Sequence, residues 1–287
     1  MEKFQIIIQL IRLDKPIGFL LLFWPCLWGL TLGYYFNNET TLYLKYIILF
    51  FLGSVLMRSA GCIFNDIVDR DLDRKVERTK ERPIASGKIL VLEAYIYIVF
   101  LCLISFLILL QFNLLTIILG MSSMILVFIY PFMKRITYWP QLFLGLTFNW
   151  GIIMGWTSIT NNMSIEPIIL YLSAIFWTLG YDTIYGLQDM HDDEIIGVKS
   201  TSIKFKNNAK VFVGTCYSIC VFFILIMLIM IEIDKYHLLL TLPFIFAFAY
   251  QIKTLKIDSP KSCLATFKNN NLIGSLIFIF IFSFIYS

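Results

Sequence analysis

Long apolar runs separated by short polar segments dominate the hydrophobic pattern of this chain. Nine runs approach the ~20 residues that a helix needs to cross the hydrocarbon layer of a membrane. They cover residues 17–36, 43–64, 90–110, 113–132, 139–159, 166–187, 211–231, 236–254 and 269–286. The boundary between the fourth and fifth runs is the least distinct, because Pro131 and Pro140 lie on either side of a basic turn. The pattern predicts an all-α polytopic membrane protein with about nine transmembrane helices.

The composition supports this fold class. Hydrophobic residues make up 59% of the 287 residues, charged residues make up 15%, and the mean hydropathy is +0.80. These values exclude an ordinary soluble domain, so we expect the lipid bilayer as a partner and no nucleic acid. The six cysteines form no Cys-x-x-Cys pair and are expected to be small core residues. We expect residues 1–287 to form a single integral-membrane domain.

The most informative polar segment follows the second run and spans residues 65–73. Asn65, Asp66, Asp69 and Asp73 would share one face of a helix, because residues three, four and seven apart lie close together. Like charges on one face repel, so a cation must lie among them. Mg²⁺ is usually held by one or two carboxylates together with substrate phosphates, and this segment supplies such ligands. The alternative is a solvated helix end that is paired with the basic residues of the same loop.

A second acidic segment follows the sixth run. Asp182, Asp189 and Asp193 would lie on one helical face, with Asp182 roughly 10 Å deeper in the membrane than Asp189. Two acidic clusters at one membrane surface suggest a shared divalent metal and, with it, a diphosphate. An ionisable residue at the depth of Asp182 is a candidate functional residue. Its alternative role is a hydrogen bond to a neighbouring helix.

Three basic residues are candidates for binding an anion. Arg58 precedes Asn65 by seven residues, so it shares the acidic face but lies about two turns deeper. It either pairs with Asp182 or binds an anionic group of a substrate, since a guanidinium suits a carboxylate in bidentate geometry. Lys134 and Arg135 lie in a turn on the same side as both acidic segments. They either set the topology or bind a diphosphate or carboxylate.

The basic residues are concentrated on one side of the predicted bundle. They lie in the N-terminal arm, the loops after the second and sixth runs, the turn after the fourth run and the segment after the eighth. All but three of the 23 basic residues belong to this side, and the exceptions are Lys45, Arg58 and Lys235. By the positive-inside rule this side faces the cytoplasm. We therefore expect the N-terminus and both acidic loops to be cytoplasmic and the C-terminus to be outside.

Taken together, these segments resemble the intramembrane aromatic prenyltransferases, and within them the bacterial 4-hydroxybenzoate polyprenyltransferases of ubiquinone biosynthesis. The resemblance covers nearly the whole chain, and the paired aspartate segments are what define the superfamily. The matching segments are residues 12–18, 24–29, 57–62, 65–73, 81–87, 130–131, 134–135, 181–185 and 189–201. The chain departs from the family at His191, where relatives often carry an acid, and at Gly186, where alanine is common.

The resemblance implies a nine-helix bundle with a large central cavity that is open laterally to lipid, in a bacterial inner membrane. The implied cofactor is Mg²⁺, and the implied substrates are polyprenyl diphosphate and 4-hydroxybenzoate. The implied metal ligands are Asn65, Asp66, Asp69, Asp73, Asp189 and Asp193. The implied catalytic residues are Asp66, Asp69, Asp182, Asp189 and Asp193. The implied substrate-binding residues are Arg12, Arg58, Asn65, Arg74, Arg82, Lys134, Arg135 and Tyr185.

The implied reaction moves the prenyl group to the ring carbon ortho to the hydroxyl and releases diphosphate. Arg12, Arg74 and Arg82 would neutralise the diphosphate, and Arg58 or Arg135 would hold the carboxylate of the acceptor. Mg²⁺ would stabilise the leaving diphosphate as the allylic C–O bond ionises. Water must be excluded, because it would quench the cation.

The proton released from the ring would go to the diphosphate or to Asp182. Alternatives within the enzyme class are prenylation of another quinone precursor or of haem. An alternative of a different class is a cation-coupled secondary transporter, for which we would expect broken helices and charges near mid-membrane. The clustering of carboxylates at one surface disfavours transport.

Overall fold

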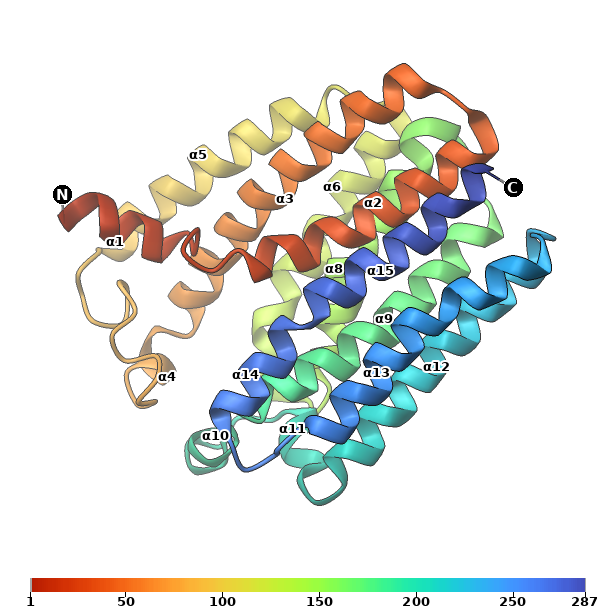
Figure 1. The fold of residues 1–287 in the computed structure, drawn as a ribbon. Helices are drawn as coiled ribbons and strands as arrows, with labels where there is room; N and C mark the ends of the chain where they lie inside the picture. Colours follow the sequence, from red (N-terminus) through yellow and green to blue (C-terminus); the bar gives the residue numbers. More distant parts are fainter. Residues whose placement is uncertain (1, 287) are drawn as a thin grey trace.

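The computed structural model describes residues 2–286 as helices and the loops that join them, of which the one between Asp73 and Val91 is long (Figure 1). The α-helices are α1 (Glu2–Leu10), α2 (Ile17–Asn37), α3 (Thr40–Val68), α4 (Arg70–Asp73), α5 (Val91–Leu109), α6 (Leu114–Ile129), α7 (Met133–Ile136), α8 (Pro140–Thr160), α9 (Ile165–Gly186), α10 (Met190–Ile196), α11 (Thr201–Lys204), α12 (Ala209–Met230), α13 (Leu242–Thr254), α14 (Pro260–Lys268) and α15 (Asn270–Phe282). The 3₁₀-helices are η1 (Tyr130–Phe132), η2 (Lys206–Asn208), η3 (Lys235–Thr241) and η4 (Ser283–Tyr286).

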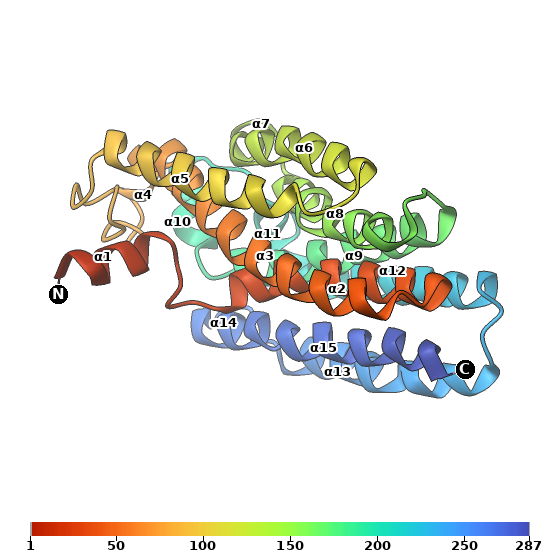
Figure 2. The ribbon, with the colours of Figure 1, turned by 90° about the horizontal axis from the view of Figure 1, so that it is seen from above.

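The long helices form one bundle, and its two ends differ in content. The N-terminal helix α1 and the short helices α4, α10 and α11 gather at one end, and the C-terminus lies at the other (Figures 1 and 2). Both acidic segments therefore lie at the same end of the bundle, as the sequence pattern predicted.

Eight stretches of the described chain are helical, long and apolar enough to cross a membrane. They correspond to eight of the nine predicted runs, so the all-α polytopic fold is confirmed. The remaining run, residues 236–254, is divided between η3 and the 13-residue helix α13. Pro243 lies in the first turn of α13, where its missing N–H is tolerated.

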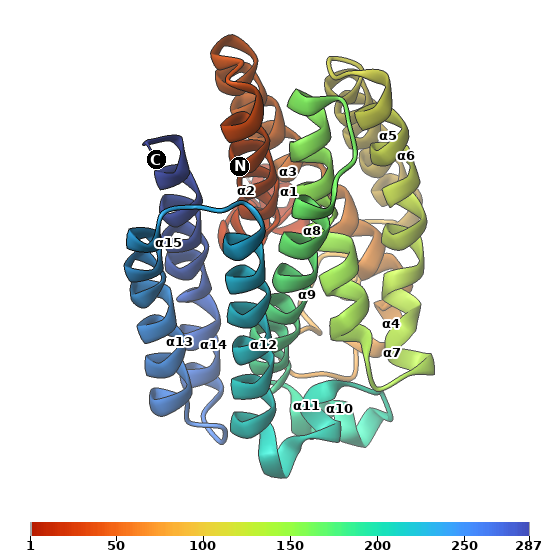
Figure 3. The same ribbon diagram turned by 90° about the vertical axis from the view of Figure 1, so that its right-hand side faces the viewer.

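Helices α2 and α9 pack on α8 (Figure 3). These three helices form the most buried part of the bundle. In their central stretches 61%, 67% and 61% of the residues are buried, against 11% for α5. Only Ala94 and Ser105 are buried in α5, and only Thr116 and Gly120 in α6. The bundle therefore has a tightly packed side around α2, α8 and α9, and a thinly packed side formed by α5 and α6.

Glycines allow α2 and α8 to approach closely. Gly29 and Gly33 are four residues apart on α2, as are Gly151 and Gly155 on α8. A Cβ atom added at Gly29 would lie 2.0 Å from the carbonyl oxygen of Ile152. Small residues at this spacing let two helix backbones come together in a membrane.

We expect Gly29→Ala to destabilise the folded protein, because the added methyl group would meet backbone atoms that cannot rotate away. The expected loss is about 1–3 kcal/mol or more, seen as a lower midpoint of thermal unfolding in detergent. Gly53→Ala is the matched control, since a Cβ at Gly53 has nothing within 4 Å. An equal midpoint for both variants would contradict the close packing of α2 and α8.

The first acidic segment, whose residues we expected to share one helical face, is divided between two helices. Helix α3 ends at Val68 and α4 begins at Arg70, with Asp69 between them at φ −95° and ψ 2°. The backbone N–H of Asp69 still donates to Asn65 O at 2.9 Å, and that of Asp73 donates to Asp69 O at 2.8 Å. Asn65, Asp69 and Asp73 therefore keep the four-residue hydrogen-bond spacing of a helix although α3 and α4 are separate helices.

The second acidic segment is also divided. Helix α9 ends at Gly186 and α10 begins at Met190, so Asp182 and Asp189 do not share one helical face as predicted. Asp189 lies immediately before α10, and its carbonyl accepts the backbone N–H of Asp193 at 2.9 Å. The predicted spacing thus holds for Asp189 and Asp193 and is wrong for Asp182.

Candidate functional site

A cavity of about 600 Å³ lies between α2, α3, α5, α6 and α8. Most of its wall is apolar and includes side chains such as Phe50, Phe112 and Met154. The lining residues that adjoin the acidic segments are Arg12, Asn65, Arg82 and Tyr185. The cavity therefore joins a charged end to an apolar interior, which is the form that a ligand with an anionic head and an apolar tail requires.

The outer wall of the cavity is formed by α5 and α6. Val99, Phe106 and Met121 line the cavity and are exposed. Few residues of α5 and α6 are buried, so little protein covers this side of the cavity.

At the charged end, two arginines bind the carboxylates of Asp66 and Asp73. Arg12 Nη2 donates to Asp66 Oδ1 at 2.5 Å, and Arg82 Nη1 donates to the same oxygen at 3.2 Å and to Asp73 Oδ2 at 2.8 Å. Both carboxylates are buried. Burial raises the pKa of Asp73 above its usual range, and the negative charge of the nearby Asp66 raises this pKa further. The positive charge of Arg82 lowers it, but the net effect is an increase. The two arginines thus supply the positive charge that the acidic face requires.

Arg12 occupies an unusual backbone conformation that places it in this cluster. Its φ is 56°, which is uncommon for a residue other than glycine. The turn at the end of α1 is held by a hydrogen bond from Ser59 Oγ to Ile11 O at 3.1 Å. Strained residues held by their surroundings are frequent at functional sites.

Asp69 is bound by Lys134, which lies in a distant turn, and by Asn65, which lies four residues earlier in the chain. Lys134 Nζ and Asn65 Nδ2 donate to Asp69 Oδ2, the latter at 2.9 Å, while Arg135 Nη2 donates to Val68 O at 2.6 Å. The other oxygen, Asp69 Oδ1, is buried and has no hydrogen-bond partner in the described chain, and Arg135 Nη2 lies 3.8 Å from it. A buried carboxylate oxygen without a partner is costly, and a hard cation would satisfy it.

Asp189 is bound by Arg78, a residue that the sequence analysis did not select. Arg78 Nε lies 2.7 and 2.9 Å from the two carboxylate oxygens of Asp189, and Nη2 also donates to Oδ2. Arg78 Nη1 donates to the hydroxyl of Tyr185 at 3.2 Å. One signal was present, because Arg74, Arg78 and Arg82 are spaced four residues apart.

The acidic residues fit Mg²⁺ by their chemistry. Burial and the neighbouring Asp189 raise the pKa of Asp193 to about 6. Among the described side chains, residues 3–286, no three of His, Cys, Asp or Glu lie close enough together to hold a metal by themselves. Mg²⁺ usually takes one or two carboxylates and completes its shell with phosphate and water. The unpaired oxygen of Asp69 is a suitable first donor, and a diphosphate would have to supply others.

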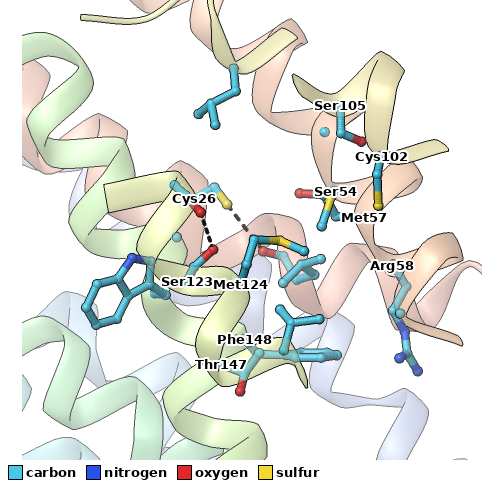
Figure 4. Close-up of a pocket in the computed structure, with 18 of the residues that line it drawn as sticks. Cys26, Ser54, Met57, Arg58, Cys102, Ser105, Ser123, Met124, Thr147 and Phe148 are labelled. Atoms are coloured by element: carbon cyan, nitrogen blue, oxygen red, sulfur yellow. Dashed lines mark hydrogen bonds between the residues drawn. The ribbon is translucent and has the colours of Figure 1, made fainter. Parts of the chain in front are cut away.

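Arg58 lies deeper in the cavity wall, on α3. Its guanidinium lies over the ring of Phe148, 5.3 Å from the ring centroid (Figure 4). In the described chain no close ion pair joins Arg58 to Asp182, although their opposite charges still attract each other. A Cβ at Gly18 would lie 2.8 Å from Arg58 Nε, so the absence of a side chain at Gly18 makes room for the guanidinium. Arg58 is therefore available to an anionic ligand.

Two predicted site residues, Arg74 and Asp182, lie outside the acidic cluster and the cavity lining. Arg74 Nε donates to Ala85 O at 2.8 Å, and its Nη1 lies 3.6 Å from the exposed Asp71. Arg74 therefore stabilises its own loop and does not reach the acidic cluster. Asp182 is partly buried on α9 and lies outside the cavity lining.

The sequence matches known proteins over most of its length. Residues 22–284 match the UbiA prenyltransferase family. The chain is 41% identical to the mitochondrial 4-hydroxybenzoate polyprenyltransferase of Drosophila pseudoobscura pseudoobscura, covering 94% of this chain and 68% of that protein. It is 40% identical to the 4-hydroxybenzoate octaprenyltransferase of Vibrio vulnificus (strain CMCP6), covering 96% of each.

Solved structures share the fold. A UbiA homologue from Aeropyrum pernix K1 in its apo form matches with a TM-score of 0.76 and 21% identity, covering 91% of this chain and 97% of that one. A UbiA homologue from Archaeoglobus fulgidus bound to GPP and Mg²⁺ matches with a TM-score of 0.72 and 20% identity, covering 98% of this chain and 100% of that one. At these identities the likeness concerns the arrangement of the helices.

Proposed function

This chain belongs to the UbiA prenyltransferase family, and on that premise we propose that it is a 4-hydroxybenzoate polyprenyltransferase of ubiquinone biosynthesis. It transfers the polyprenyl group of polyprenyl diphosphate to the ring carbon ortho to the hydroxyl of 4-hydroxybenzoate. The observation that carries this proposal is the cavity, which joins a cluster of carboxylates and arginines to an apolar interior that contains the guanidinium of Arg58. A diphosphate, a prenyl chain and an aromatic carboxylate each have a matching surface there.

The charged end binds the diphosphate in this proposal. Asp66, Asp69 and Asp189, helped by Asn65 and Asp193, are the residues that would hold Mg²⁺. When it is bound, Mg²⁺ neutralises charge on the leaving diphosphate. Arginine and lysine side chains already at this end then contact the remaining diphosphate oxygens, since they form charge-assisted hydrogen bonds with anions. These are Arg12, Arg82, Lys134 and Arg135.

The interior binds the acceptor and the chain. The Arg58 guanidinium holds the carboxylate of 4-hydroxybenzoate and so orients the ring with its ortho carbon toward the diphosphate end. The apolar wall takes the prenyl chain and excludes water, which would otherwise react with the allylic carbon. Tyr185 lies between the two regions, because it lines the cavity and contacts Arg78. The diphosphate is the first candidate for the acceptor of the ring proton, and Asp182 is the second, because Asp182 lies outside the cavity lining.

The chain is a multi-pass membrane protein. We further place it in a bacterial inner membrane as a single domain, with the N-terminus and both acidic segments in the cytoplasm and the C-terminus outside. This orientation is supported by the concentration of basic residues at the end of the bundle that carries the acidic segments. It puts the acidic residues where Mg²⁺ and a water-soluble aromatic acid are available.

The full-length protein in lipid nanodiscs should prenylate 4-hydroxybenzoate when given polyprenyl diphosphate and Mg²⁺, with the product measured by mass spectrometry. We expect no product in the presence of a chelator. 4-Hydroxybenzyl alcohol, which lacks the carboxylate, and benzoate, which lacks the activating hydroxyl, should be poor acceptors. Transfer to another quinone precursor or to haem, without transfer to 4-hydroxybenzoate, would refute the proposed acceptor. Substrate flux in proteoliposomes without any transfer would refute the enzyme class.

A further inference from the structure

The N-terminal helix α1 carries apolar side chains on two of its faces. On one face, Ile6 and Leu10 pack into an apolar cluster together with residues of α3 and α5. On another face, Phe4 and Ile8 are also four residues apart, and neither belongs to that cluster. Phe4 is 67% exposed and Ile8 is half-buried. Because residues four apart share a face of a helix, one apolar face of α1 is covered by protein and a second remains exposed.

The third face of α1 is polar. Gln5 and Gln9 are exposed and are again four residues apart. A helix with separate apolar and polar faces can lie in the plane of a membrane surface, with its apolar face at the boundary between headgroups and acyl chains. In water the same apolar face would be hydrated, which is unfavourable. The pattern of α1 is therefore that of an interfacial helix.

The contacts of α1 place it at the level where neighbouring helices enter the membrane. Lys3 Nζ lies 3.3 Å from Oε1 of Glu93, which is in the first turn of α5. Leu92 and Ile96 of α5 are exposed, and α5 is long and apolar enough to span the membrane. At its other end, α1 is joined through residues 11–16 to α2, a second such helix. The exposed apolar face of α1 therefore lies near the membrane surface at which both helices begin.

The end of α1 fixes the position of Arg12. The backbone N–H of Leu13 donates to Ile8 O at 3.1 Å, and that of Arg12 donates to Gln9 O at 3.3 Å. With Arg12 at φ 56°, these are the hydrogen bonds of a Schellman motif, in which a residue in the left-handed conformation closes the helix. The Arg12 side chain donates to Asp66. A displacement of α1 would therefore move this guanidinium relative to Asp66.

We propose that α1 is an interfacial helix that inserts Phe4 and Ile8 into the leaflet at the acidic end of the bundle, and that this insertion holds Arg12 on Asp66. Lipid is the occupant of the exposed face, because that face adjoins the exposed apolar surface of α5. The location of α1 is independent of the reaction. Its effect through Arg12 rests on the proposed function, because that effect is measured as prenyl transfer.

Site-directed spin labelling of the full-length protein in nanodiscs tests the location of α1. A nitroxide attached at Phe4→Cys should collide often with oxygen, which concentrates in lipid, and rarely with a water-soluble nickel chelate. Gln9→Cys, on the polar face, is the matched control and should show the opposite preference. The unsubstituted protein gives the background labelling, which should be low because five of its six cysteines are buried.

Two results of the labelling would overturn the proposal. A label at Phe4 that the nickel chelate reaches as easily as the label at Gln9 would place the exposed face of α1 in water. A label at Phe4 that is shielded from both oxygen and the chelate would place that face under protein, such as a second copy of this chain.

A double-mutant cycle on kcat/KM for polyprenyl diphosphate tests the link to Arg12. Phe4→Asp should shift α1 from the inserted toward the detached state by about tenfold or more and so lower kcat/KM, and Phe4→Trp should restore it. Gln5→Asp adds the same charge on the polar face and should leave kcat/KM near the wild-type value. In an Arg12→Ala background Phe4→Asp should have little further effect, because both changes act through one contact.

Arg82 also donates to Asp66, so Arg12→Ala should keep measurable transfer, and Arg12→Lys is the second background if it does not. Fully additive effects of the two changes, or wild-type transfer by Phe4→Asp, would overturn the link to Arg12. If no form of the protein transfers a prenyl group, the proposed function fails, and the labelling result still decides where α1 lies.

Discussion

Asp69→Ala and Asp189→Ala should each reduce prenyl transfer by about a thousandfold or more, since a metal at a leaving group supplies several kcal/mol and each 1.36 kcal/mol is tenfold in rate. Asp69 is buried, binds Lys134 and has one oxygen without a hydrogen bond. Its loss would remove a metal donor and leave the lysine without its partner. The measurement is the initial rate of transfer to 4-hydroxybenzoate in nanodiscs at saturating Mg²⁺.

Asp71→Ala is the matched control for this prediction. Asp71 belongs to the same acidic segment, but its side chain is 73% exposed and pairs only with Arg70 and Arg74. We expect nearly wild-type transfer from it. Full activity in both Asp69→Ala and Asp189→Ala would refute a metal held between the two acidic segments.

Arg58→Ala should weaken binding of 4-hydroxybenzoate far more than binding of polyprenyl diphosphate. A hydrogen-bonded charged pair contributes about 1.5–3 kcal/mol, so the KM for 4-hydroxybenzoate should rise by roughly 10- to 100-fold. The KM for polyprenyl diphosphate should change little, because Arg58 lies two helical turns from the carboxylates. Arg58→Lys should recover part of the loss, since lysine keeps the charge without the planar donor pair.

A second variant tests the same role without removing the guanidinium. Gly18→Ala would place a methyl group 2.8 Å from Arg58 Nε and displace the side chain. The KM for 4-hydroxybenzoate should again rise while that for polyprenyl diphosphate stays near its original value. Gly214→Ala is the control, because its Cβ would meet only Ile252 at an ordinary 3.5 Å. Equal increases in both KM values would contradict the assignment of Arg58 to the acceptor.

The apolar runs predicted the fold well because hydrophobic length is a local property of the sequence. Helices α2, α8 and α9 lie within a residue or two of the predicted runs. The run at 236–254 differs because local chain geometry, with a 3₁₀-helix before Pro243, changes the helix type without changing the hydropathy. The expected shared face of Asp182 and Asp189 was wrong for the same kind of reason, since spacing alone does not reveal that the chain leaves the helical conformation between Gly186 and Met190.

Residue spacing predicted the acidic side of the candidate site more directly than its basic side. The aspartates have a recognisable spacing, whereas their basic partners are set by tertiary folding. Lys134 is 65 residues from Asp69, and Arg78 is 111 residues from Asp189. Within the loop after α4, the equal spacing of Arg74, Arg78 and Arg82 gave no reason to choose among them. The loop is not one regular helix, so the helical spacing did not determine which arginines turn inward.

The unequal packing of the bundle bears on how proteins of this fold can diverge. Substitutions among the close-packed glycines of α2 and α8 change the backbone distance between two central helices, and natural selection should remove most of them. Substitutions in the outer wall at Val99, Phe106 or Met121 change the volume beside the prenyl chain while disturbing few neighbours. Preference for a longer or shorter chain can therefore drift between lineages through α5 and α6, while the groups that carry the chemistry stay fixed.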